Sequence, residues 1–214
     1  MNLGDTRTYL RDLLGEASPG FWSNATLNRF IQRSFLEVYT EFTSTNEAYF
    51  ATTVDIAYVS GTQLYALPAA GIARVLLVER SDLSPIVTLN PIALVQKNDY
   101  QSQGGVTIQQ GEERYYFLGN QMGFVPTPGA AGTARIYFVP EPTLPAVDAD
   151  NYPAELTEMH HELIAWGGFI RAITKDRELL ELHMPHYSRL WDLCRNDVAR
   201  RQTQDNIGFI PRPE

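Results

Sequence analysis

The most informative helical stretch of the sequence is PAELTEMHHELIAWGGFIRAITKD, residues 153–176. Its apolar residues recur at the spacing of one helix face, and they are Leu156, Met159, Leu163, Gly167, Ile170 and Ile173. The same stretch places His160, His161 and Glu162 side by side near the start of the helix, where an enzyme would carry metal ligands. The segment is therefore either part of a catalytic site or a packing helix with polar residues on its exposed side.

The metal hypothesis rests on His161-Glu162 as the first half of a zinc hydrolase motif. That motif is HExxH, because two histidines one helical turn apart point the same way and share the metal. Ala165 stands where the second histidine belongs, although His183 and His186 in the next helix remain possible ligands. We expect no metal ligands and no catalytic residues here, and interpret the polar trio as exposed and available to a neighbouring subunit.

Other signs of chemistry are weak. DADN at 148–151 lacks the D-x-D-x-D-G pattern of a calcium loop, so its acidic residues are expected to form a turn. The single cysteine, Cys194, lies in an apolar helical stripe, which predicts a buried and inert thiol. No GxSxG nucleophile elbow is present. We therefore predict that the protein is not an enzyme and needs no cofactor.

Helices are also predicted on both sides of this stretch. DRELLELHMPHYSRLWDLCRNDVARR (176–201) continues the helical spacing, with Pro185 expected to break or kink it. Near the N-terminus, Asp5 is a candidate N-cap of a first helix that ends at Gly15. A second helix, FWSNATLNRFIQRSFLEVYTEF (21–42), has Ser23 or Asn24 as N-cap, with Phe21 and Trp22 expected to fold back as a hydrophobic staple.

The centre of the chain has a different character. Short segments rich in β-branched and aromatic residues alternate with turn residues, which predicts an antiparallel sheet or small sandwich. RYYFLGNQMGFVP (114–126) is expected to form a hairpin at Gly119-Asn120, and VTIQ (106–109) to form a further strand. A helical interruption is predicted at PIALVQKNDY (91–100), with Pro91 in its first turn.

The predicted fold class is therefore α+β: N-terminal and C-terminal helices form one bundle, with a central antiparallel β-rich subdomain and an extended C-terminal tail. The expected boundaries are 1–47 and 141–202 for the helices of the bundle, 48–140 for the β-rich subdomain and 203–214 for the tail. In the tail, a polar spacer precedes IGFIPRPE, which is too short to form its own core. We hypothesise that Ile207, Phe209, Ile210 and Pro211 anchor it on another protein.

Composition and charge limit the functions that remain. The formal net charge is -8, which argues against a nucleic-acid grip, because binding phosphates requires a surplus of Lys and Arg. No run approaches the roughly 18 to 20 apolar residues that span a bilayer, so no membrane anchor is expected. A single cysteine excludes an intramolecular disulfide and suits the cytoplasm, or an assembly made there.

The order of these segments resembles the head-to-tail connector, or adaptor, proteins of tailed bacteriophages. FWSNATLNRFIQRSFLEVY is similar to the family's aromatic pair, cap and amphipathic helix, with Asn24 where Asp is more usual. TQLYALPAAGIARVLLVE (62–79) is similar to its Tyr-x-Leu-Pro strand element. Residues 115–172 follow the family's hairpin, Pro-x-Pro turn, strand and acidic turn into a final helix with a His near its start.

The resemblance implies a structural virion protein of the neck, assembled in the host cytoplasm. It implies a homo-oligomeric ring, expected as a dodecamer, that docks on the portal protein, extends the DNA channel and offers a surface to tail or nozzle proteins. DNA would pass through without specific binding, which an acidic lining favours. Two alternatives stay open: another tail-completion or stopper component, and a metal-dependent hydrolase using His161, Glu162 and His183 or His186.

Overall fold

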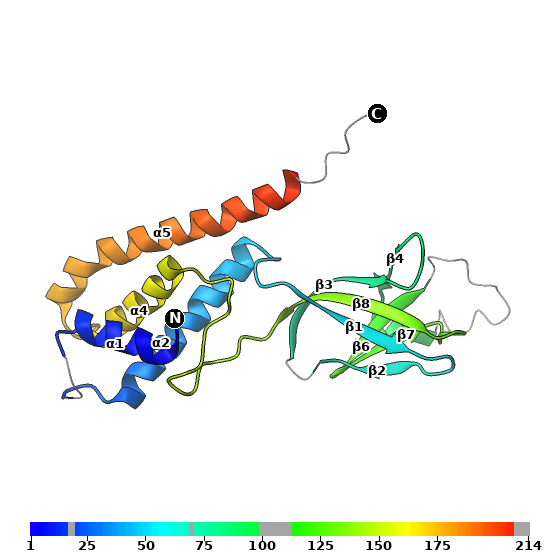
Figure 1. Ribbon diagram of the computed structural model, residues 1–214, viewed down its shortest axis with the longest axis horizontal. Helices are drawn as coiled ribbons and strands as arrows, with labels where there is room; N and C mark the ends of the chain where they lie inside the picture. The colour runs from blue at the N-terminus through cyan, green and yellow to red at the C-terminus, as the bar shows by residue number, and fades with distance from the viewer. Residues whose placement is uncertain (17–19, 69–70, 99–112, 208–214) are drawn as a thin grey trace. The chain divides into compact units, whose positions relative to one another are not determined.

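The structure, a computed structural model, describes residues 1–16, 20–68, 71–98 and 113–207, with side chains as far as Arg201. The chain forms two compact units (Figure 1). The helical unit comprises Met1–Phe50 and Pro142–Glu214, and the β unit comprises Ala51–Glu141. Helices at both ends of the chain and strands at its centre confirm the predicted α+β class.

The first helix, α1 (Leu3–Leu13), begins three residues earlier than the sequence suggested. Asn2 is its N-cap: the Asn2 side chain accepts a hydrogen bond from the Asp5 backbone nitrogen at 2.8 Å, and the Asp5 carboxylate accepts one from the Asn2 nitrogen at 3.4 Å. The prediction of Asp5 as the cap is wrong, because Asp5 instead closes a reciprocal capping box from the third helical position.

The second helix, α2 (Asn24–Thr45), follows the predicted pattern. Ser23 is the N-cap, and its hydroxyl accepts a hydrogen bond from the Thr26 nitrogen at 3.2 Å. One face is buried at the predicted helical spacing, formed by Leu27, Ile31, Ser34, Phe35, Val38, Tyr39 and Phe42. This face packs mainly on α4.

The decisive stretch forms α4 (Glu158–Ala172), the central helix of the unit. It packs against α1, α2 and α5, so every residue from Leu163 to Phe169 is buried. The predicted single stripe is too narrow, because a helix with neighbours on several sides buries most of its circumference. Gly167 and Gly168 allow this packing: a Cβ at Gly167 would lie 2.0 Å from the Ser34 hydroxyl.

The last helix, α5 (Arg177–Ile207), is 31 residues long and contains Pro185 (Figure 1). The predicted break at Pro185 is wrong. Pro185 and Glu181 are both exposed, so solvent can satisfy the backbone carbonyl that loses its helical donor. The helix also includes residues 203–207, which were expected to begin an extended tail. The sequence has no Gly or Pro between Pro185 and Gly208, so no helix-breaking residue ends the helix earlier.

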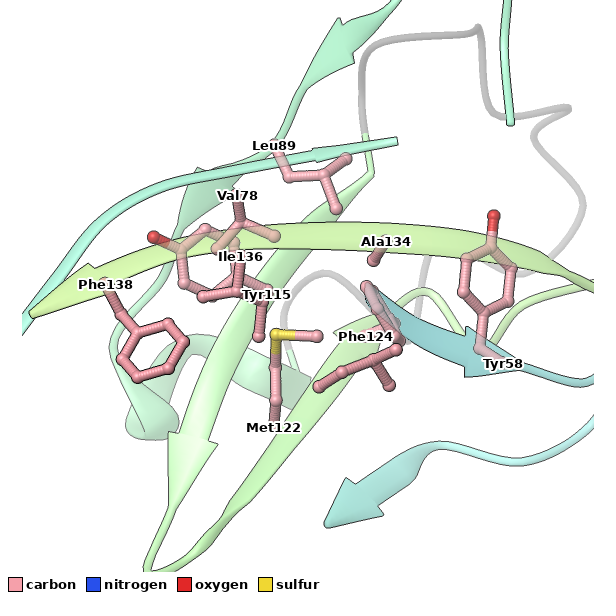
Figure 2. Close-up of a cluster of buried hydrophobic side chains, with 10 residues drawn as sticks. Tyr58, Val78, Leu89, Tyr115, Met122, Phe124, Ala134, Ile136 and Phe138 are labelled. Carbon is pink, nitrogen blue, oxygen red and sulfur yellow. The ribbon is translucent and has the colours of Figure 1, made fainter. Parts of the chain in front are cut away.

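Strands of the β unit form two four-stranded sheets in the described part of the chain. One has the order β1 (Thr52–Tyr58), β8 (Gly132–Pro140), β3 (Ile72–Arg80) and β4 (Val87–Thr88); the other has β2 (Leu64–Ala66), β7 (Gln121–Val125), β6 (Arg114–Leu118) and β5 (Asn90–Pro91). Both sheets contribute to one apolar core (Figure 2): Ile56, Tyr58, Val78, Leu89, Tyr115, Met122, Phe124, Ala134, Ile136 and Phe138. The unit is therefore a small sandwich.

The predicted hairpin is confirmed: β6 and β7 pair antiparallel, and Gly119 at the turn has φ of +58°. The predicted helical interruption at 91–100 begins later than expected. Pro91 lies in β5, paired parallel to β6, so its predicted place in the first helical turn is wrong; a 3-10 turn follows at Leu94–Gln96, and residues 97–98 are helical. The Ile92 nitrogen donates to the Tyr115 carbonyl at 2.8 Å, which ties this segment to the sheet. The predicted strand at 106–109 lies outside the described residues.

Candidate functional site

His160, the first candidate residue, lies wholly inside the helical unit with 0% of its surface exposed. Its ring nitrogen Nδ1 accepts a hydrogen bond from the Thr157 backbone nitrogen at 3.1 Å. The proton of the neutral ring therefore belongs on Nε2, which faces Asp197 Oδ2 of α5 at 3.6 Å. His160 thus accepts the hydrogen bond of a backbone N–H at the start of α4, and its own Nε2–H points toward α5.

The carboxylate that faces His160 belongs to a small charged cluster. Asp197 pairs with Arg201 one helical turn later at 3.0 Å, and the Arg201 guanidinium lies 5.3 Å from the centre of the Tyr49 ring. Burial lowers the pKa of His160 to about 4, although the Asp197 charge acts in the opposite direction. At neutral pH the imidazole is uncharged, and the cluster serves to join α4 to α5.

His161 is also buried, with 6% of its surface exposed, and its ring lies 5.4 Å from that of Tyr152. Burial lowers its pKa to about 4, with smaller contributions from the N-terminal ammonium group and His160. The expectation that both histidines lie on an exposed polar side is wrong, because other segments cover both sides of the first turn of α4. Glu162 alone of the trio is partly exposed, and its contact with a neighbouring subunit stays a prediction.

The other two histidines lie elsewhere in the unit. His186 packs against Trp166 with ring centres 4.5 Å apart, and His183 packs against Phe169 at 5.0 Å. Among the described residues, no group of three His, Cys, Asp or Glu side chains is placed to hold a metal ion. Both histidines therefore serve as aromatic packing partners in the described structure.

Cys194 and the acidic DADN segment have structural roles. Cys194 is buried on α5, and burial raises the pKa of its thiol to about 12, which confirms the prediction of an inert thiol. Asp150 accepts hydrogen bonds from the backbone nitrogens of Ala146 and Val147 at 2.7 and 2.9 Å. Arg7 binds both carboxylate oxygens of Asp148, at 2.7 and 2.5 Å. The segment is a turn, as predicted.

A groove that the sequence did not predict lies at one corner of the helical unit. We call it the aromatic groove; it has a volume of about 960 Å³ and apolar walls that include Leu14, Phe21, Trp22, Phe30, Ile173 and Leu179. Phe21 is 85% exposed, and its ring lies 4.9 Å from that of Trp22 in an edge-to-face contact. Trp22 in turn packs edge-to-face on Phe30 at 5.6 Å.

The predicted staple is therefore only half right. Trp22 folds back on α2, whereas Phe21 projects into the open side of the groove. The sequence contained one signal of this difference. Two adjacent aromatic residues precede the N-cap Ser23, whereas a hydrophobic staple uses only one. The remaining walls come from the turn between α4 and α5, far away in the sequence, so no local pattern could have indicated the groove.

Polar contacts from Glu16 and Arg11 hold the aromatic pair in place. The Glu16 carboxylate accepts hydrogen bonds from the backbone nitrogens of Gly20, Phe21 and Trp22. Arg11 pairs with Glu16 at 2.7 Å and also donates to the Trp22 carbonyl at 2.9 Å. The groove wall is thus fixed before any partner arrives, which lowers the entropic cost of binding.

The predicted docking residues lie at or beyond the last described residues. The backbone of Ile207 ends α5, while its side chain and all of Phe209, Ile210 and Pro211 lie outside the described residues. Of the helices in the described part of the chain, none has the length and apolar character needed to cross a membrane. No curated protein matches the chain.

One comparison does identify a family. The model of the SU10 adaptor protein family matches residues 1–208, nearly the whole chain. The match spans the first helices, the β unit and α4 with α5, so it covers the ordered succession of segments and not a single motif. The chain therefore belongs to the SU10 adaptor protein family, a family of structural bacteriophage proteins.

Proposed function

We propose that this chain is a head-to-tail adaptor of a tailed bacteriophage. Copies of it form a ring, expected as a dodecamer, that docks on the portal, continues the DNA channel and offers the attachment surface for the tail. The observation that carries this proposal is the family match over residues 1–208. Assembly takes place in the host cytoplasm, and the finished ring is part of the virion neck.

The surface of α5 supports an assembly role. Leu182 and Leu193 are exposed, and eleven residues, about three helical turns, bring them to the same face of the helix. Leu179 and Met184 are exposed on the same helix. Large apolar side chains grouped on a solvent-facing helix indicate a protein contact, here with a neighbouring copy or the portal.

Net charge supports a passive relation to DNA. The chain carries 25 acidic and 17 basic residues. A ring with this charge repels the phosphate backbone and lets the duplex slide, whereas a basic ring would hold it. Repulsion of this kind suits a channel through which DNA slides without being held.

Binding to purified portal rings tests the proposal. We expect the full-length chain to co-sediment with portal rings and to form a ring on them, visible by negative-stain electron microscopy. Deleting residues 203–214 should abolish this attachment and leave the monomer folded, with only the small loss of helical circular dichroism that the removed end of α5 accounts for. Binding to purified tail parts but not to portal rings would favour a stopper or tail-completion component instead.

A further inference from the structure

The aromatic groove has a definite shape and no covering segment among the described residues of the helical unit. Its lining includes the exposed aromatic ring of Phe21 and the apolar side chains of Ile173 and Leu179. Exposed apolar surface of this kind marks sites of protein contact, and fixed walls lower the entropic cost of binding. An occupant that fits the groove is short, apolar and able to lie against aromatic rings.

The sequence contains one segment with this chemistry beyond α5. Residues 207–213 read IGFIPRP, in which three large apolar residues precede two prolines. Proline-containing segments dock well in aromatic-lined grooves, because their restricted backbone loses little entropy on binding. Phe209, Ile210 and Pro211 match the groove lined by Phe21 and Trp22.

The length of α5 decides which copy supplies the segment. Leu179 lines the groove at the start of α5, and Ile207 ends the same helix 28 residues later, which is about 42 Å away at 1.5 Å per residue. From Ile207 to Pro211 the chain can span at most about 14 Å. A chain therefore cannot bring Phe209–Pro211 back to its own groove.

We infer that the aromatic groove binds residues 207–213 of a second copy of this chain. This inference rests on the proposed function, since it describes a contact between neighbours in the adaptor ring. The contact joins two different surfaces, the groove of one copy and the terminal segment of the next. Such a head-to-tail contact generates a closed ring when the rotation between copies closes.

A labelled peptide of residues 203–214 tests the groove directly. Fluorescence anisotropy should show saturable binding of the peptide to the full-length chain. Phe21→Ser should weaken binding about tenfold or more, because it removes a large apolar contact. Val95→Ser is the matched control, since Val95 is 86% exposed and lies in the β unit, and it should leave binding unchanged.

The aromatic groove and the terminal segment should each contribute to binding. A peptide carrying Phe209→Ser and Ile210→Ser should not bind, and circular dichroism should show that the Phe21→Ser chain is folded. Absence of saturable binding by the unaltered peptide would overturn the inference. Binding that Phe21→Ser leaves at its original strength would overturn it equally.

Disulfide trapping tests whether the contact joins two copies. The only native cysteine, Cys194, is buried, so Phe21→Cys and Phe209→Cys provide the reactive thiols. A chain with both substitutions should give a ladder of covalent multimers on a non-reducing gel, with and without portal rings, whereas each single variant should give dimers at most. An intrachain disulfide, or no ladder, would contradict the inference.

The same experiments separate this inference from the proposed function. Portal binding without peptide binding or a ladder would leave the adaptor function standing and reject the groove contact. Peptide binding and a ladder without portal binding would support the groove contact and reject the adaptor function.

Discussion

The helical unit and the β unit keep different residues in their interiors. The β unit has an apolar core shared by its two sheets. The partly buried Arg80 side chain forms ion pairs with Asp82 and Glu113. The helical unit buries two neutral histidines and a thiol. It contains all four histidines and all three tryptophans of the chain.

The two units therefore differ in how strongly their stability depends on pH. The helical unit depends on the protonation state of buried rings, and it also carries the aromatic groove and the exposed leucines of α5. The β unit contains no histidine, so its stability does not depend on the protonation of an imidazole ring. Because Trp22, Trp166 and Trp191 all lie in the helical unit, tryptophan fluorescence reports on that unit, and the two can be compared in one protein.

The largest effect is expected from Gly123→Ala in the β unit. A Cβ there would lie 2.3 Å from the Cζ atom of the buried Tyr116 ring, which has little room to move. We expect a loss of roughly 1–3 kcal/mol in the free energy of unfolding. Far-UV circular dichroism in urea should detect it, while the tryptophan transition shifts less. Equal shifts of both signals would mean that the units unfold together.

Gly167→Ala makes the corresponding change in the helical unit. Its Cβ would lie 2.0 Å from the Ser34 hydroxyl and 3.0 Å from the Tyr187 hydroxyl. Overpacking typically costs about 1–3 kcal/mol and opposes the roughly 1 kcal/mol that Ala gains over Gly in a helix, so the net loss should be about 0–2 kcal/mol. The urea midpoint of tryptophan fluorescence measures it. Gly129→Ala is the control, because no atom lies within 4 Å of its added Cβ.

Acidification should weaken the helical unit selectively. The pKa of His160 and of His161 is about 4 in the folded chain, compared with about 6.5 for an unperturbed histidine. Between these values the unfolded chain binds more protons, so stability rises with pH through this window and is lost as pH falls from 6.5 to 4.

His161→Phe tests the source of this loss, since His161 packs on Tyr152 and a phenyl ring retains that contact. Between pH 7 and pH 4.5, the midpoint of tryptophan fluorescence in urea should fall less in His161→Phe than in the unaltered chain. An identical pH dependence in both proteins would show that His161 is not a source of the effect.

The smallest effect is expected at an ion pair on the surface of the β unit. Arg135 binds Asp55 across β8 and β1 at 2.8 Å, with both side chains well exposed. Solvent screens such pairs, so Asp55→Asn should leave the urea midpoint by far-UV circular dichroism almost unchanged. A shift as large as that of Gly123→Ala would contradict the expectation that exposed ion pairs contribute little to the stability of this unit.

Local sequence patterns predicted the parts of the fold that depend on local interactions. The Ser23 cap, the buried face of α2 and the hairpin at Gly119 each follow from a few adjacent residues. The wrong predictions involve distant partners. Polar residues at the start of α4 look exposed in the sequence, but His160 and His161 become buried when α5 and the Tyr152 segment pack beside them.

The same limit applies to the candidate site. Phe21 and Ile173 are 152 residues apart, and only packing of the helical unit brings them to one groove. Pro91 is a plausible first residue of a helix in isolation, yet pairing with β6 places it in a strand. Non-local contacts of this kind leave no periodic signal, which is why the fold class was predictable and the groove was not.

Cryo-electron microscopy of the neck in the assembled phage particle tests the central claim most directly. We expect a ring between portal and tail whose density accommodates the helical unit, with residues 207–213 of each copy in the aromatic groove of the next. A neck ring built from a different protein, with this chain located elsewhere in the particle or missing from it, would contradict the adaptor function.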